Sequence, residues 1–367
     1  MELAHLVLRQ AEEPSPVRCS SSNDYDGRIG IRISSIFVIL VGSMFGAVFP
    51  VFARRNRQLG IPESLFFIAK YFGSGVIIAT AFIHLLAPAN EALGDECLTG
   101  VIAGYPWPEG IALMTIFLMF FLELMTMRFG NFGGERSHDE HAHAHGGAPH
   151  DSGSLEDRAK IAVREGNQGH GHQIGEDHLA HTRDHTDNSE LGSDFEERGI
   201  IPETYAAQIT AIFILEFGVI FHSVFIGLTL AVSGDEFITL YIVLVFHQMF
   251  EGLGLGSRLA MVPWPKSKRW TPYVMGVAYG LSTPIAIAIG LGVRTSYPPG
   301  SATTLLTNGV FDSISAGILI YTGLVELMAH EFMFSPYMQK GPVSRMLGAF
   351  TLMVLGAGLM ALLGKWA

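Results

Sequence analysis

Charged side chains are scarce in this chain of 367 residues, and acidic residues outnumber basic ones. Asp, Glu, Lys and Arg together make up 16% of the sequence, and the formal net charge is -11. Nucleic-acid-binding proteins present a basic surface, so this balance argues against a nucleic-acid partner. The sequence also lacks a Gly-x-x-x-x-Gly-Lys-Ser/Thr phosphate-binding loop, which argues against a pump driven by ATP.

The His-Glu-x-x-His motif of zinc metalloproteases is also missing. The only His-Glu pair is His330-Glu331, and Phe334 stands where the second histidine of that motif would be. Both histidines are needed to hold the catalytic zinc of that class. The sequence therefore argues against an intramembrane protease, and we predict neither an enzymatic activity nor a resident cofactor.

Hydrophobic residues, by contrast, are abundant. They make up 49% of the chain, and the mean hydropathy is +0.34. Residues 33–53, 270–293 and 346–364 contain no charged side chain, and each stretch is long enough to cross about 30 Å of hydrocarbon. We predict an all-α integral membrane protein with eight transmembrane helices. The expected spans are 31–53, 65–88, 109–129, 206–232, 236–258, 271–293, 308–331 and 344–365.

Basic residues in the short loops predict the orientation of the spans. In an eight-span arrangement, the loops after the first, fifth and seventh spans share one side of the membrane. These loops carry Arg54, Arg55, Arg57, Arg258, Lys266, Lys268, Arg269, Lys340 and Arg345. We expect that side to be cytosolic and both termini to be extracellular, with the protein in the plasma membrane. An intracellular store membrane, with release to the cytosol, is the alternative.

The chain has only two cysteines, Cys19 and Cys97. Both fall on the side predicted to be extracellular, where an oxidising environment permits a disulfide. Such a bond would tie the amino-terminal tail to the loop after the second span. Two unrelated free thiols are the alternative, because sequence does not show proximity.

The predicted spans divide the chain into four parts. Residues 1–30 form an extracellular tail, 31–129 the first three spans, 130–205 a cytosolic loop and 206–365 the last five spans. The loop has few large apolar residues to offset its ordering entropy, so we predict that it is disordered. It holds ten of the fifteen histidines, with a dense cluster at His138, His141, His143 and His145. Such tracts bind transition metals loosely; a solvated linker is the alternative.

Polar residues interrupt the fourth and fifth spans at matching depth. His222 and His247 are each 12.5 residues from the midpoint of the turn between these spans, so both lie about 19 Å from it, near the membrane centre. Glu251 follows His247 by four residues and shares its helix face. Two imidazoles and a carboxylate at one buried point predict a divalent metal site, with zinc as the expected ion. A structural His–Glu hydrogen bond is the alternative. Ser223 and Gln248 are either accessory ligands or interhelical contacts.

Four further residues extend this site into a pathway. An ionisable group inside a bilayer costs about 2.5 kcal/mol or more, so it needs a partner or a purpose. We expect His84 and Glu91 at the outer mouth, and Glu326 and His330, which share a helix face, near the inner end. Interfacial side chains are the alternative. The order from outside to inside is that of a cation pathway into the cytosol.

Other ionisable residues of the spans are predicted to be mainly structural. Lys70 and Glu123 both fall near inner helix ends, and we predict that they pair with each other. Glu216 lies between the central site and the inner end of its span, as an exit-side ligand or a salt-bridge acceptor. Glu331 is either a pathway residue or an interfacial side chain.

The central motifs read His222-Ser223-Val224-Phe225-Ile226-Gly227 and His247-Gln248-Met249-Phe250-Glu251-Gly252-Leu253-Gly254-Leu255-Gly256. They resemble the ZIP (Zrt/Irt-like) family of metal transporters, and most closely its plant and fungal branch. Residues 81–86 and 315–321 also resemble the second and seventh helices of that family. The likeness covers essentially the whole chain, including the histidine-rich loop between the third and fourth spans.

The resemblance implies a secondary transporter that moves a divalent metal into the cytosol by alternating access. The metal would be zinc or, alternatively, iron(II) or manganese. Carried over by position, the primary ligands would be His222, His247 and Glu251. Some members hold two metals with a carboxylate four residues after the first histidine; Ile226 stands there in this chain, so that bridging ligand is missing.

Expected partners are the metal ion, the lipid bilayer and a possible second copy of the chain in a homodimer. A membrane-anchored metal sensor is the alternative of another class. That alternative leaves the buried residues His222, His247 and Glu251 unexplained.

Overall fold

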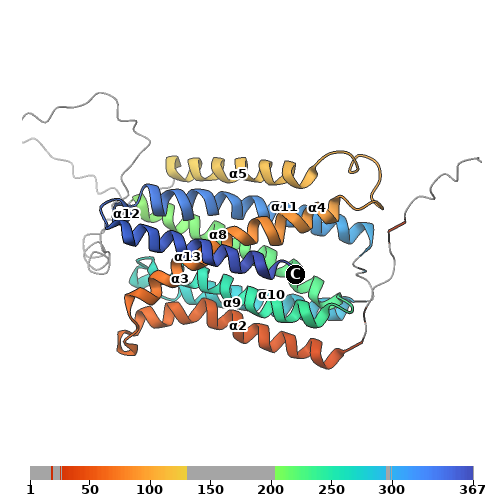
Figure 1. The fold of residues 1–367 in the computed structure, drawn as a ribbon, viewed down its shortest axis with the longest axis horizontal. Helices are drawn as coiled ribbons and strands as arrows, with labels where there is room; N and C mark the ends of the chain where they lie inside the picture. The colour runs from red at the N-terminus through yellow and green to blue at the C-terminus, as the bar shows by residue number, and fades with distance from the viewer. Residues whose placement is uncertain are drawn as a thin grey trace, which may run out of the picture.

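The computed structural model describes residues 18–19, 25, 27–129, 203–294, 298 and 300–366. Within these ranges all the regular structure is helical, and eight helices are long and apolar enough to cross a membrane. They lie side by side along the long axis of the molecule (Figure 1). The predicted fold class, an all-α multi-pass membrane protein with eight spans, is confirmed.

The spans are formed by the following elements. They are α2 (Ile29–Arg55), α3 (Glu63–Ala79) with η2 (Thr80–Leu86) and α4 (Ala87–Leu93), α5 (Trp107–Phe129), α8 (Glu203–Val232), α9 (Phe237–Met261), α10 (Thr271–Val293), α11 (Ala302–Thr322) with η4 (Gly323–Met333), and α13 (Val343–Leu363). Three short elements, η1 (Arg57–Leu59), η3 (Lys266–Lys268) and α12 (Pro336–Gln339), lie in the connections.

The second and seventh spans are longer than the sequence predicted. They cover Glu63–Leu93 and Ala302–Met333, and each contains a π-helical segment, η2 or η4. The seventh span begins early because Ser301 caps it: its side chain accepts a hydrogen bond from the Thr304 backbone nitrogen. Such a cap stabilises a polar first turn, so the helix begins before the stretch that hydropathy identifies as the span.

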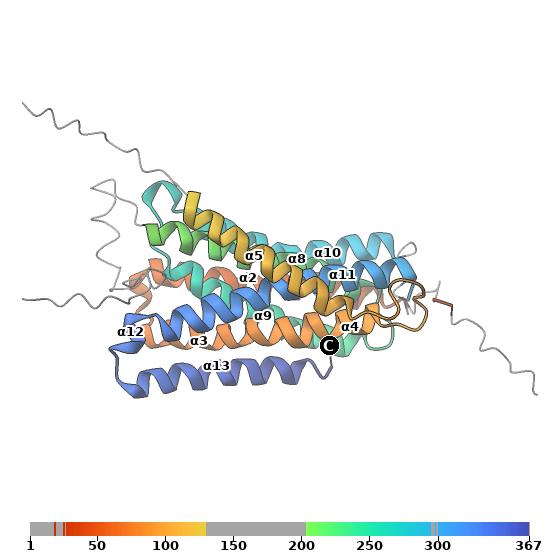
Figure 2. The same ribbon diagram turned by 90° about the horizontal axis from the view of Figure 1, so that it is seen from above.

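Helices α8 and α9 follow one another along the chain but pack mainly against different neighbours. Helix α9 packs along α2 and α3, and α8 packs along α10 and α11. Helix α13 covers α3 at one edge of the bundle (Figure 2), and α5 covers α11 at another edge (Figure 1). Helices α8 and α9 therefore pack little against each other, and polar side chains can lie between them in the bundle interior.

Arg32 holds the turn between α8 and α9. Its side chain is fully buried and donates hydrogen bonds to the carbonyls of Leu230, Ala231 and Ser233, at 3.3, 3.0 and 2.6 Å. Leu230 and Ala231 belong to the last turn of α8, where carbonyls lack helical partners, and Ser233 follows that turn directly. The guanidinium also lies 4.3 Å from the ring centroid of Phe237, the first residue of α9. One arginine of α2 thus fixes the end of α8 and the start of α9.

Cys19 and Cys97 form a disulfide, with their Cα atoms 4.9 Å apart. The bond joins the amino-terminal tail to the loop after α4, as the first of the two alternatives predicted. The interpretation as free thiols is therefore wrong.

Charged residues connect three elements at the end of the bundle where the loops are basic. Glu331 on η4 lies 2.8 Å from Arg258 of α9 and 3.3 Å from Lys70 of α3, measured from Oε1 to the nitrogens Nη1 and Nζ. Arg258 also donates to Ser74 Oγ of α3 at 2.7 Å. We call Lys70, Ser74, Arg258 and Glu331 the inner ion cluster, because the basic loops predict that this end of the bundle faces the cytosol. Glu331 is therefore a partner of two cations.

The predicted pair of Lys70 and Glu123 is wrong. Lys70 contacts Glu331, and Glu123 accepts a hydrogen bond from the Tyr321 hydroxyl at 2.5 Å. The reason is that hydropathy gives the depth of a residue but not its direction around the helix axis. Helix α5, which carries Glu123, packs on α11, whereas α3 packs on α9 and α13.

Two glycines let α3 and α9 touch backbone to backbone. A Cβ atom placed on Gly73 would lie 2.2 Å from the Cα atom of Gly254. Carbon atoms in favourable contact are about 3.5–4.0 Å apart, so no side chain fits there. Close packing of this kind is how small residues join helices in a bilayer.

We expect Gly73→Ala to destabilise the protein by about 1–3 kcal/mol, because the new methyl group forces α3 and α9 apart. The measurement is thermal unfolding of the purified protein in detergent. Gly358→Ala on α13 is the matched control, since no atom lies within 4 Å of a Cβ atom there. Equal unfolding temperatures for the two variants would contradict the packing.

We expect Glu331→Gln to lower the free energy of unfolding by up to about 3–5 kcal/mol, because Arg258 and Lys70 lose their shared counter-charge at a mostly buried position. The same unfolding measurement tests it. Glu236→Gln, at an exposed position in the turn before α9, serves as control and should unfold like the wild type. An unchanged Glu331→Gln variant would show that the inner ion cluster contributes nothing to stability.

Candidate metal site

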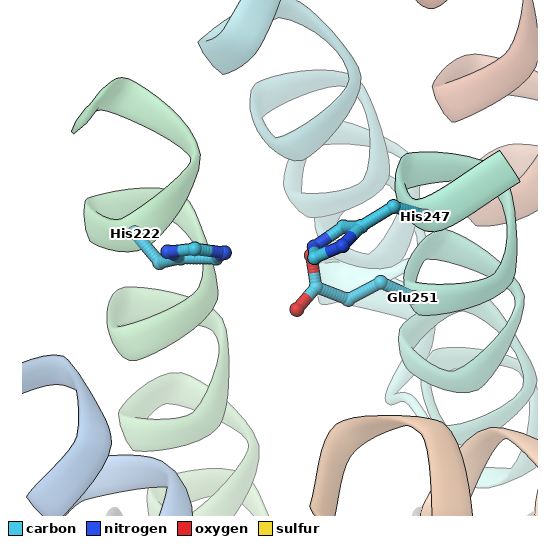
Figure 3. Close-up of side chains that lie close together, drawn as sticks. All are labelled: His222, His247 and Glu251. Atoms are coloured by element: carbon cyan, nitrogen blue, oxygen red, sulfur yellow. The ribbon is translucent and has the colours of Figure 1, made fainter. Parts of the chain in front are cut away.

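Three side chains meet between α8 and α9. His222 comes from α8, and His247 and Glu251 come from α9; they point toward one another (Figure 3). One ligand atom from each lies within 4.8 Å of the other two. His247 Nε2 is 3.8 Å from Glu251 Oε2, and the two imidazole centroids are 5.6 Å apart. No other such group of three or more His, Cys, Asp or Glu residues occurs in the described part of the chain.

Five of the six possible ligand atoms of these residues are buried without a hydrogen-bond partner. His222 is 2% exposed, and His247 and Glu251 are fully buried. Both ring nitrogens of each histidine and Oε1 of Glu251 lack a partner. Buried polar atoms are normally paired, and each unpaired one costs about 1–3 kcal/mol. A bound cation would satisfy one ring nitrogen of each histidine and a carboxylate oxygen of Glu251 at once.

The donor chemistry suits a divalent transition metal. Two imidazole nitrogens and one carboxylate oxygen are a three-ligand set of zinc sites that keep a fourth position open. Magnesium and calcium prefer oxygen ligands alone, so this set disfavours them. An open coordination position also fits an ion that must be released again.

The two histidines share a depth because of the hairpin between them. The turn after α8 ends at Phe237, and the residues from each histidine to that turn are equal in number. The third ligand is added by helix geometry, since Glu251 follows His247 by four residues and lies one turn further along α9. Counting residues therefore predicts that the three ligands lie at similar depth.

The accessory residues lie beside the ligands and contact each other. Gln248 Nε2 donates a hydrogen bond of 3.4 Å to Ser223 Oγ, which joins α9 to α8. Tyr279 of α10, which the sequence analysis did not select, donates to Gln248 Oε1 at 2.7 Å. Its only signal in the sequence is a phenol in a span without charged residues, and that is weak.

His84 lies deeper than the outer mouth predicted for it. Its ring centroid is 4.6 Å from that of His247, and its Nε2 lies 2.9 Å from the carbonyl oxygen of Met360 on α13. The sequence ended this span at residue 88, but the helix continues to Leu93, so His84 lies well inside it. Glu91 is exposed on α4, seven residues beyond His84, and the structure does not bring the two together.

Glu326 and His330 lie together on η4, as their spacing predicts. His330 Nδ1 is 3.2 Å from Glu326 Oε2. Glu326 also lines a cavity between α5, α8 and the seventh span, together with Glu123 and Tyr321. The cavity contains two carboxylates and lies away from the three central ligands.

Two predictions about the remaining residues stay open. Glu216 is buried on α8, and its Oε2 atom has no hydrogen-bond partner, so its role as an exit-side ligand remains a prediction. The loop histidines, His138, His141, His143 and His145, lie outside the described residues.

Comparison with known proteins gives the family. The family model described as ZIP Zinc transporter matches residues 29–364. Zinc-regulated transporter 2 of Saccharomyces cerevisiae is 46% identical over 97% of this chain and 99% of its own length. Zinc-regulated transporter 1 of Schizosaccharomyces pombe is 41% identical over 99% of this chain and 92% of its own length. Zinc transporter 3 of Arabidopsis thaliana is 32% identical over 95% of this chain and 89% of its own length. No solved structure matches the chain. The chain therefore belongs to the ZIP zinc transporter family, and it is a zinc transporter rather than an enzyme.

Proposed function

We propose that this protein carries Zn²⁺ into the cytosol by alternating access around His222, His247 and Glu251, without ATP. The observation that carries the proposal is the set of buried, unpartnered ligand atoms contributed by two different helices. Because α8 and α9 pack mainly against different neighbours, they can shift relative to each other and so open the site to one side or the other. The metal would bind when the three ligands converge and leave when they separate.

The direction of transport rests on the positive-inside rule. Basic residues lie in the loops after α2 and α9, and Arg55 donates a hydrogen bond to the Arg269 carbonyl across these two loops. We assign this end to the cytosol, in the plasma membrane, with both termini and the 1–30 tail extracellular. The Cys19–Cys97 disulfide supports the assignment, since such bonds persist in oxidising compartments.

The pathway would run through the residues predicted from the sequence. Zinc would pass Glu91, meet His84 beside the central ligands, and leave past Glu326 and His330. The contact between the rings of His84 and His247 supports a direct hand-over between imidazoles. The histidine-rich loop over residues 130–205 would receive the metal on the cytosolic side.

The bilayer is the expected partner of the outer helix faces. Phe37, Phe45, Phe49 and Phe52 of α2 are exposed apolar side chains, and in a membrane they would contact lipid. A homodimer would have to form through such a face. Iron(II) and manganese are the competing substrates to test, because the ligand set does not exclude iron(II).

Zinc uptake by cells that express single-residue variants tests the transport site. We expect His247→Ala and Glu251→Ala to lower radiolabelled zinc uptake per surface protein by more than about 10-fold, since even indirect partners of a metal are worth 10–100-fold in affinity. Glu236→Ala, exposed in the turn of the same hairpin, is the control and should transport normally. Wild-type uptake by His247→Ala would refute the site, and competition by iron and manganese would rank the metals.

Epitope accessibility tests the orientation. A tag inserted within residues 130–205 should be protected in intact cells and become accessible after permeabilisation, whereas a tag at the carboxyl terminus should be accessible without it. The reverse pattern would place the basic loops outside and reverse the proposed direction. Both tagged proteins should first be shown to retain zinc uptake.

A further inference from the structure

Tyr279 of α10 reaches the metal site from a third helix. The residue is fully buried, and its hydroxyl lies 2.7 Å from the backbone carbonyl oxygen of Gln248, 2.7 Å from Gln248 Oε1 and 3.5 Å from Glu251 Oε2. All three atoms are acceptors, so the single hydroxyl proton is the donor they share. Tyr279 thus contacts both Glu251, a proposed ligand, and Gln248, which follows the proposed ligand His247 in the chain.

The hydrogen bonds continue across the site to α8. The Gln248 oxygen Oε1 accepts from Tyr279, and its nitrogen Nε2 donates to Ser223 Oγ at 3.4 Å. We call Tyr279, Gln248 and Ser223 the polar bridge. An amide nitrogen has no lone pair for a metal, and the Tyr279 hydroxyl occupies one of the two lone pairs of the amide oxygen. Gln248 is therefore arranged to connect three helices.

The contact with Tyr279 makes the surroundings of the two carboxylate oxygens of Glu251 different. Oε2 lies 3.5 Å from the Tyr279 hydroxyl and 3.8 Å from His247 Nε2, whereas Oε1 has no partner. A hydroxyl beside one oxygen limits rotation of the carboxylate and leaves the other oxygen available. Groups that orient a ligand in this way are part of the metal affinity of a site.

Tyr279 is itself held rigidly by its neighbours. A Cβ atom on Gly252 would lie 2.9 Å from Tyr279 Cε1, so the glycine lets the phenol ring lie against α9. The next residue of α10, Gly280, accepts a hydrogen bond of 3.1 Å from Ser43 Oγ of α2 through its carbonyl. The hydroxyl therefore comes from a fixed point in the bundle.

We propose, on the basis of the proposed function, that Tyr279 is a positioning residue of the transport site. Its hydroxyl orients the Glu251 carboxylate for zinc and holds Gln248 as a connector between α8, α9 and α10. Gln248 and Ser223 act through this polar bridge and not as metal ligands.

The test is the zinc concentration dependence of uptake by Tyr279→Phe, which keeps the ring and removes only the hydroxyl. The apparent KM for zinc should rise by about 10-fold, in the range of indirect metal partners, while the maximal rate per surface protein changes far less. A purely structural role would lower the amount of folded protein and leave KM unchanged. Tyr273→Phe on the same helix, whose ring lies beside Arg55, is the matched control and should keep the wild-type KM.

Gln248→Leu tests whether Gln248 connects the helices or binds the metal. It also tests the inference if Tyr279→Phe fails to reach the membrane. We expect it to retain saturable uptake, with KM raised no more than in Tyr279→Phe. Loss of transport as complete as in His247→Ala would overturn the inference, as would a wild-type KM for Tyr279→Phe. Wild type and His247→Ala are measured in parallel: if they do not differ, the proposed function fails, whereas an unchanged Tyr279→Phe with both as expected refutes only this inference.

Discussion

The structure depends on keeping five polar atoms of His222, His247 and Glu251 buried without partners. These atoms gain no stabilisation from hydrogen bonds within the protein, so other contacts must hold their helices in place. Apolar packing around Tyr279 and Leu255, which belong to the largest buried cluster, supplies one contribution. Backbone contact between Gly73 and Gly254 supplies another. Close packing of the surrounding helices thus holds His222, His247 and Glu251 in place without hydrogen bonds to these five atoms.

Helix α9 is anchored at both ends, whereas its ligands lie in the middle. Arg32 holds the turn before it, and Arg258 in the inner ion cluster ties its other end to α3 and η4. Helix α8 shares the first anchor but packs mainly on α10 and α11. A movement of α8 relative to α9 would therefore change the distance from His222 to His247. This arrangement is compatible with the proposed separation of the ligands during transport.

The sequence predicts those features that depend on length and count. Eight spans follow from hydropathy, and the equal depth of His222 and His247 follows from their spacing about one turn. Direction around a helix axis is different, because a helix that is apolar on all sides carries no stripe to orient it. The sequence therefore predicts the wrong partner for Lys70 and gives no clear signal for Tyr279. It also predicts too shallow a position for His84, because the π-helical segment η2 continues into α4, which hydropathy does not reveal.

If His222, His247 and Glu251 bind the metal as proposed, the polar bridge and Ile226 together favour a single ion there. Ile226 packs against an apolar cluster that includes Leu230 and Phe237, so it offers no ligand where some family members have a bridging carboxylate. Gln248 and Ser223 are hydrogen-bonded to each other. With neutral imidazoles, Glu251 is the one negative ligand, so a single Zn²⁺ leaves about one net positive charge and a second would leave about three. In a buried, low-dielectric site the second charge would find no counter-charge among these ligands to offset its desolvation.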